Sequence, residues 1–70
     1  MSRLVTAIVA DYNTRDVIDV ATGKALCNCT STHAAKEWAA DMGYTWTTKR
    51  QDRDRAIHNY NRWVRQQEAA

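Results

Sequence analysis

The pattern of apolar positions near the start of the chain predicts a β-strand. Between Arg3 and Tyr12 the residues alternate with a period of two and include many β-branched side chains, which is typical of a strand. Val5, Ala7 and Val9 would give this strand one fully apolar face.

A turn and a β-hairpin are predicted next. Asn13-Thr14-Arg15 has turn character, and two further strands, over residues 16–20 and 24–30, flank Ala21-Thr22-Gly23. Gly23 supplies the positive φ that a short hairpin loop needs. We therefore expect three consecutive antiparallel strands within residues 3–30.

Residues 32–42 have the period of an amphipathic helix. The apolar positions recur at i, i+3, i+4 and i+7, as the stripe Ala35, Trp38, Ala39 and Met42. The N-cap candidates are Thr30, Ser31 and Thr32. Gly43 suits the left-handed position that ends a helix, and Tyr44 can fold its ring back over the last turn.

A second helix is predicted over residues 48–68. Thr48 and Gln51 have the spacing of a capping box. The apolar stripe occupies only the second half of the helix, as Ala56, Ile57, Tyr60, Trp63 and Val64, whereas residues 49–55 are almost wholly charged. We therefore expect this helix to project, or to dock only its C-terminal half, with Tyr60 and Trp63 as anchors.

These elements predict an α+β fold in a single domain, residues 1–70, with a three-stranded antiparallel sheet followed by two helices (β-β-β-α-α). The sheet would span residues 3–30, the first helix residues 32–42 and the basic helix residues 48–68. A three-stranded sheet is close to the minimum for independent stability, and one of its faces would stay partly bare unless the second helix or a second protomer covered it. We therefore predict a homodimer.

Charge is unevenly distributed along the chain. The formal net charge of +2 combines four cations against five anions in residues 1–43 with six against three in residues 44–70. The second part thus has a balance of +3, and most of it lies on the basic helix. This excess permits nucleic-acid binding without requiring it, because dedicated binders are usually more basic.

Membrane insertion and secretion are not indicated. No stretch approaches the 18 apolar residues of a membrane span. Residues 4–10 are too short for a signal peptide and alternate like a strand. Two cysteines without a secretory signal indicate a reducing compartment, so we expect the protein in the cytoplasm, and in the host cytoplasm if a phage encodes it.

The chain contains four residues of the types that bind zinc, Cys27, Cys29, His33 and His58. The C-x-C spacing departs from the two to four residues that usually separate zinc ligands. Alternation along the third strand would place both cysteines on one face with Ala25, as small apolar side chains of the core. We therefore predict no metal.

Enzymatic activity is not predicted. Neither histidine is accompanied by a nucleophile elbow, a pair of carboxylates in an apolar setting or a glycine-rich phosphate loop. Both glycines have structural roles, at a hairpin and at a helix end. We expect a non-enzymatic protein without a cofactor.

Partner binding is the function that the basic helix favours. Arg, Trp and Tyr are the residue types that dominate protein-binding hot spots. The Lys and Arg side chains of this helix could also neutralise the phosphates of a nucleic acid. We predict a protein partner and keep nucleic acid as the alternative. The predicted contact residues are Trp46, Lys49, Arg50, Arg53, Arg55, Arg62 and Trp63.

Residues 17–44 resemble a pattern found in small phage and prophage accessory proteins. The matching segments are Val17-Ile18-Asp19, Thr22-Gly23, Ala34-Ala35-Lys36-Glu37-Trp38-Ala39 and Gly43-Tyr44. The resemblance implies a sheet-hairpin-helix unit in a phage-borne protein of the anti-CRISPR kind, which inhibits a host or defence protein by stoichiometric binding. It carries over no functional residue, and the basic helix lies outside it.

Overall fold

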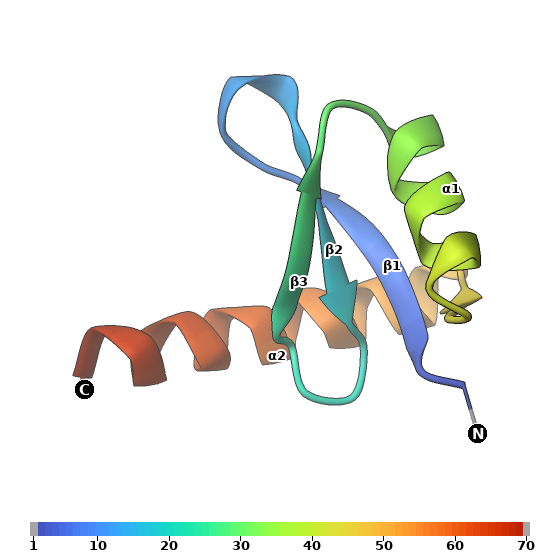
Figure 1. Cartoon of the computed structure of the whole chain (residues 1–70). Helices are drawn as coiled ribbons and strands as arrows, with labels where there is room; N and C mark the ends of the chain where they lie inside the picture. The colour runs from blue at the N-terminus through green and yellow to red at the C-terminus, as the bar shows by residue number, and fades with distance from the viewer. Residues whose placement is uncertain (1, 70) are drawn as a thin grey trace.

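The computed structural model describes residues 2–69 and contains four strands and two α-helices around one mixed sheet (Figure 1). In chain order the elements are β1 (Leu4–Val9), the 3-10 turn η1 (Asp11–Asn13), β2 (Arg15–Asp19), β3 (Ala25–Cys29), α1 (Thr32–Asp41), β4 (Thr45–Trp46) and α2 (Arg50–Ala69). The strand order across the sheet is β3-β2-β1-β4. The α+β class is therefore confirmed.

The prediction of three antiparallel strands missed β4. This two-residue strand pairs parallel to β1, with Leu4 opposite Thr45 and Val5 opposite Trp46. A parallel neighbour requires a crossover connection, and α1 provides it by carrying the chain from the β3 edge of the sheet to the β1 edge. A strand of two residues is too short to show alternation, so the sequence pattern could not reveal it.

The predicted signals for α1 are confirmed at both ends. The Ser31 side chain accepts a hydrogen bond from the backbone N–H of Ala34 at 3.1 Å. Gly43 has a φ of +78° directly after the helix, and the Tyr44 ring lies 5.6 Å from that of Trp38. The predicted apolar stripe is shorter than expected, because Met42 is 55% exposed at the helix end.

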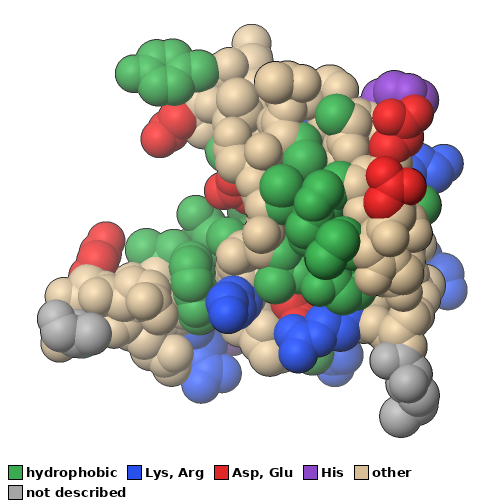
Figure 2. Space-filling view, viewed as in Figure 1, with side chains coloured by type: hydrophobic (Ala, Val, Ile, Leu, Met, Phe, Trp, Pro, Cys, Tyr) green, Lys and Arg blue, Asp and Glu red, His purple; other side chains and the backbone are tan. Residues whose placement is uncertain are grey.

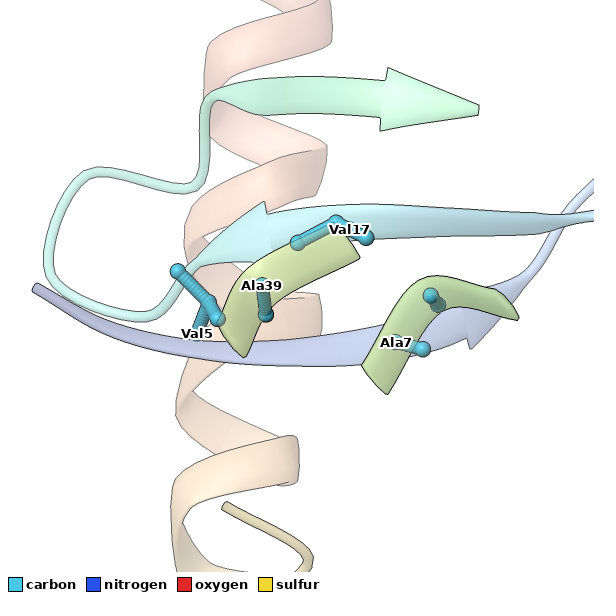
Figure 3. Packing of buried hydrophobic residues seen from close by; sticks show 5 residues of the cluster. Val5, Ala7, Val17 and Ala39 are labelled. Atoms are coloured by element: carbon cyan, nitrogen blue, oxygen red, sulfur yellow. The ribbon is translucent and has the colours of Figure 1, made fainter. Parts of the chain in front are cut away.

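One half of the core lies between the sheet and α1 (Figure 3). Its buried members are Val5, Ala7, Val17, Ala35 and Ala39. The alanine side chains of α1 allow the helix to approach the strands closely. Larger hydrophobic side chains pack around the edge of this cluster. These partly buried residues are Leu26, Cys27, Cys29, Trp38, Tyr44 and Trp46.

The other half of the core lies between the opposite sheet face and α2. Ile18, Val20 and Ala56 are buried there, with Tyr60 packed against them. Of the two alternatives for covering this face, the second helix or a second protomer, the structure shows the first, since α2 of the same chain packs on it. Of the second half of α2, which was expected to dock, Ala56 and Tyr60 pack on this face, whereas the last turns of the helix extend past β3 (Figure 1).

A bulge in the β2–β3 pairing places Ala25 and Leu26 on the opposite faces of the sheet from those predicted. Val17 pairs with Cys27, but the next residue, Ile18, pairs with Ala25. Leu26 is therefore the extra residue, and an extra residue shifts the alternation of a strand by one. As a result Ala25 packs on the α2 side, whereas Leu26 joins Cys27 on the α1 side.

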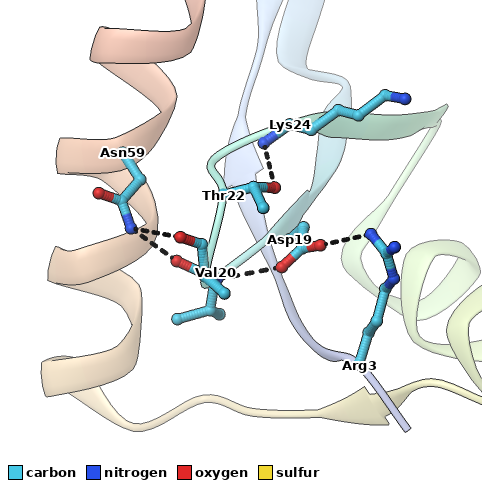
Figure 4. Close-up of polar contacts among 7 residues, drawn as sticks. Arg3, Asp19, Val20, Thr22, Lys24 and Asn59 are labelled. Carbon is cyan, nitrogen blue, oxygen red and sulfur yellow. Dashed lines mark hydrogen bonds and ion pairs between the residues drawn. The ribbon is translucent and has the colours of Figure 1, made fainter.

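The β2–β3 turn is fastened to α2 (Figure 4). The Asn59 side-chain amide donates to the carbonyl oxygens of Val20, at 2.8 Å, and Ala21, at 3.3 Å. Within the turn, Asp19 accepts a hydrogen bond from the Ala21 N–H at 3.0 Å and an ion-paired one from Arg3 at 2.7 Å. These contacts fix where α2 crosses the sheet and hence where its charges are presented.

Candidate partner-binding surface

The start of α2 is set by Thr47 rather than by the predicted box of Thr48 and Gln51. The buried Thr47 hydroxyl donates to the Asp52 carboxylate at 2.7 Å and accepts from the Lys49 N–H at 3.3 Å. An acidic side chain in the first turn also suits the positive end of the helix dipole. This arrangement anchors the charged first turn against the end of β4.

The cations of α2 are divided between two flanks of the helix. A helix turns about 100° per residue, and Ala56 faces the sheet. Arg50 and Arg53 consequently lie on one flank, and Arg55 and Arg62 lie on the other. The predicted contact residues therefore do not form one continuous surface.

A hollow of about 90 Å³ lies on the flank that carries Arg50 and Arg53, where the C-terminal end of β1 meets the start of both helices. Its lining residues are Thr6, Ala7, Val9, Arg15, Thr32, Trp46, Thr48 and Arg53. A shallower depression shares Thr48 and Arg53 with it and is completed by Arg50, Asp54 and Ile57. We call these two together the basic hollow.

The basic hollow combines cations with accessible apolar groups. Val9 is 65% exposed and Ile57 is 42% exposed, while Trp46 is partly buried beside them. The Arg15 guanidinium donates to the carbonyl oxygens of Asn13, at 2.7 Å, and Thr14, at 3.1 Å, which holds it near the rim.

The second flank of α2 bears a separate polar hollow beside the hairpin turn. It is lined by Ala21, Thr22, Asn59, Arg62, Trp63 and Gln66. Arg62 follows Arg53 by nine residues, which is about 13 Å along a helix. Among the predicted contact residues, the structure thus groups Trp46, Arg50 and Arg53 together. It groups Arg62 with Trp63, and Lys49 and Arg55 line neither hollow.

Sequence reasoning missed Arg15, Val9 and Ile57 as members of this surface. Arg15 had been assigned to a turn, and the two apolar residues had been assigned to apolar stripes that would be buried. Only the packing of β1, α1 and α2 around one corner brings them together, so no local signal could have identified them.

The α2 cations have no intramolecular ion pairs within the part of the chain that the structure describes. The ion pairs found in residues 2–69 join Arg3 to Asp19 at 2.7 Å and His33 to Glu37 at 3.0 Å. Most of the α2 cations are exposed. Their charge is therefore available to a bound molecule.

The two cysteines and two histidines do not form one metal site in the part of the chain that the structure describes. The Sγ atoms of Cys27 and Cys29 lie 3.7 Å apart, and burial, with contributions from Cys27 and Asp16, raises the pKa of the Cys29 thiol. A raised pKa keeps this thiol neutral and disfavours the nucleophilic thiolate. His33 and His58 are both exposed on different helices, and the described residues hold no group of three or more His, Cys, Asp or Glu that could share a metal ion.

Comparison with known proteins returned no match to a protein family, to a curated protein or to a solved structure. Neither helix within residues 2–69 is long and apolar enough to cross a membrane. The fold and its surface define a small α+β domain whose most distinctive feature is a corner that combines exposed arginines with accessible apolar side chains.

Proposed function

We propose that this protein is a small, non-enzymatic binding protein that uses the basic hollow to bind an acidic surface of a protein partner. The observation that carries the proposal is the grouping of Arg50 and Arg53 with Trp46, Val9 and Ile57 at one corner. A partly buried aromatic side chain among arginines is typical of binding hot spots. Asp54 in the same surface also suits a protein better than a uniformly negative phosphate backbone.

The resemblance of residues 17–44 to small phage accessory proteins extends this proposal. It favours a stoichiometric inhibitor or modulator of a host or defence protein, acting in the host cytoplasm. In such a mechanism the folded domain needs only to present its surface and to occupy a site on its target.

Nucleic-acid binding through α2 is the second candidate. It is favoured by the cations that no ion pair engages within residues 2–69 and by Trp63, which is partly exposed beside Arg62. Tyr60, whose ring centre lies 6.2 Å from that of Trp63, packs on the core. That packing limits its use in stacking on bases.

The test compares two double variants, one on each flank of α2. Affinity purification from a cognate host, with and without nuclease, would use the natural protein, Arg50→Ala with Arg53→Ala, and Arg55→Ala with Arg62→Ala. We expect a nuclease-resistant protein partner whose affinity falls at least about tenfold in the first variant, because hot-spot truncations commonly exceed 1.4 kcal/mol. The second variant should retain it.

Two other results would contradict the protein-binding proposal. Recovery of nucleic acid alone, with retention that weakens steeply as salt rises and is reduced in both variants, would favour the second candidate. Equal protein binding by all three proteins would exclude the basic hollow as the contact surface.

We propose in addition that two copies of the chain pair through β3. This strand forms one edge of the sheet, and its partly exposed Leu26 and Cys27 adjoin Trp38 on the α1 side. Figure 2 shows hydrophobic side chains gathered on this face of the molecule beside α1. Antiparallel pairing of two β3 strands is compatible with the two-fold symmetry of a dimer.

A further inference from the structure

β1 extends well beyond its neighbour β4. The Thr45 N–H donates to the carbonyl oxygen of Arg3 at 2.7 Å, and the Thr47 N–H donates to that of Val5 at 2.9 Å. After Thr47 the chain turns away into α2. Within the described residues, the part of β1 that follows Val5 therefore has no strand on this side.

The direction of the backbone groups of β1 follows from its pairing with β2. The Val20 N–H donates to the carbonyl oxygen of Leu4, and the Ala10 N–H donates to that of Thr14. Bonded and non-bonded positions alternate along an antiparallel pair, so the even-numbered residues of β1 bond to β2. The N–H and C=O groups of Ala7 and Val9 consequently point toward the side where β4 has ended.

The 90 Å³ part of the basic hollow lies along this open edge. Ala7 and Val9 line one side of it, and Trp46 and Thr48, at the end of β4 and just after it, line another. The hollow thus occupies the space in which a longer β4 would continue. Unpaired edge groups of this kind are a template for an added strand.

We propose that an extended acidic segment of the protein partner adds as a strand beside Ala7 and Val9. This inference rests on the proposed protein-binding function and specifies its mode. Arg15 and Arg53 line the 90 Å³ part of the basic hollow, and no carboxylate is among the described residues that line this part, which favours a negatively charged segment. The exposed Val9 side chain offers an apolar contact to alternate residues of such a strand.

The first test uses a defined peptide and amide exchange measured by NMR. The probe is a five-residue peptide, acetylated and amidated, in which glutamate and valine alternate. We expect it to slow the exchange of the Ala7 and Val9 amides at least about tenfold, whereas the Thr6 and Ile8 amides should already be protected in the free protein. An analogue with lysine in place of glutamate, and one with N-methylated backbone amides, should have little effect.

Peptide binding that leaves the exchange of Ala7 and Val9 unchanged would overturn strand addition. The proposed function would survive that result if the Arg50→Ala, Arg53→Ala variant still lost its partner, so the two failures are distinguishable. No peptide binding at millimolar concentration would also overturn the inference. Protection of Ala7 and Val9 by self-association alone would overturn it as well, since a second copy would then occupy the edge.

The second test is a substitution that blocks the edge without disturbing the β1–β2 ladder. Val9→Pro removes an N–H that faces away from β2, and proline is tolerated at such edge positions. We expect affinity for the peptide to fall at least about tenfold, while Val9→Thr, which keeps the N–H and the branched shape, should change it by less than about threefold. Protected Thr6 and Ile8 amides would show that Val9→Pro is folded, and full peptide affinity in that variant would overturn the inference.

Discussion

Gly23 shows how one residue can fix the position of a whole helix. It is buried, has a φ of +79°, and lies so close to α2 that a Cβ atom would overlap the backbone of Asn59 and Tyr60. Glycine is therefore needed here for its backbone conformation and also for its lack of a side chain. Gly43 has nearly the same φ, +78°, but a Cβ there would meet open space.

Gly23→Ala should consequently destabilise the protein more than Gly43→Ala. We expect the latter to cost about 1–2 kcal/mol, the penalty of a left-handed residue, and the former roughly 2–5 kcal/mol, since overpacking adds to it. Urea unfolding of the two variants measures the difference in the free energy of unfolding. Equal losses would show that the hairpin turn does not press against α2.

At the scale of elements, the junction between β4 and α2 determines which cations meet the sheet. The Thr47 hydroxyl binds both Asp52 and the Lys49 N–H, so the helix starts at a defined point and in a defined direction. The pairing of β4 with β1 places this point at the corner where Arg53 lines the hollow. The position of the flank that carries Arg50 and Arg53 thus depends on the two hydrogen bonds of Thr47 and on the pairing of β4 with β1.

Thr47→Val should therefore destabilise the protein, whereas the exposed Thr48→Val should not. Losing a helix-start hydroxyl typically costs about 1 kcal/mol, and the neighbouring surface substitution should stay within about 0.5 kcal/mol. Thermal unfolding followed by circular dichroism compares the two variants. A larger loss for Thr48→Val would indicate that the capping box expected from the sequence operates after all.

At the scale of the whole molecule, the two sheet edges have different proposed partners. The open part of β1 is bordered by arginines, whereas β3 is bordered by the partly exposed apolar residues that pack against α1. An edge strand left open favours unwanted association, so specific partners at both edges would also protect the fold. The proposed dimer places β3 against its own copy.

Light scattering should then give a mass twice the 8.0 kDa of one chain. The Asp19 N–H donates to the carbonyl oxygen of Lys24, so the odd-numbered residues of β2 bond to β3. Asn28 lies opposite the even-numbered Asp16, and its N–H therefore faces the outer edge of β3. Asn28→Pro should be monomeric because it blocks that edge, while Asn28→Ala, which loses the same side-chain hydrogen bonds to Thr14 and Asp16, should remain dimeric. A monomeric natural protein would refute the dimer.

The sequence by itself determined those elements whose signals are local. The alternation of β1, the glycine of the hairpin and the cap residues of α1 act through the backbone of their own few residues, and all three predictions are confirmed. The boundaries of both helices were likewise predicted to within two residues.

Only the tertiary structure decided how these elements meet. β4 exists because α1 returns the chain to the edge of β1, and Leu26 faces α1 because of a bulge against β2. Packing of α2 against the sheet through Ala56 decides which flank of the helix meets the end of β1, and it brings Arg53 together with Arg15. These contacts join residues far apart in the chain, and their energies depend on packing, which periodicity and composition do not encode.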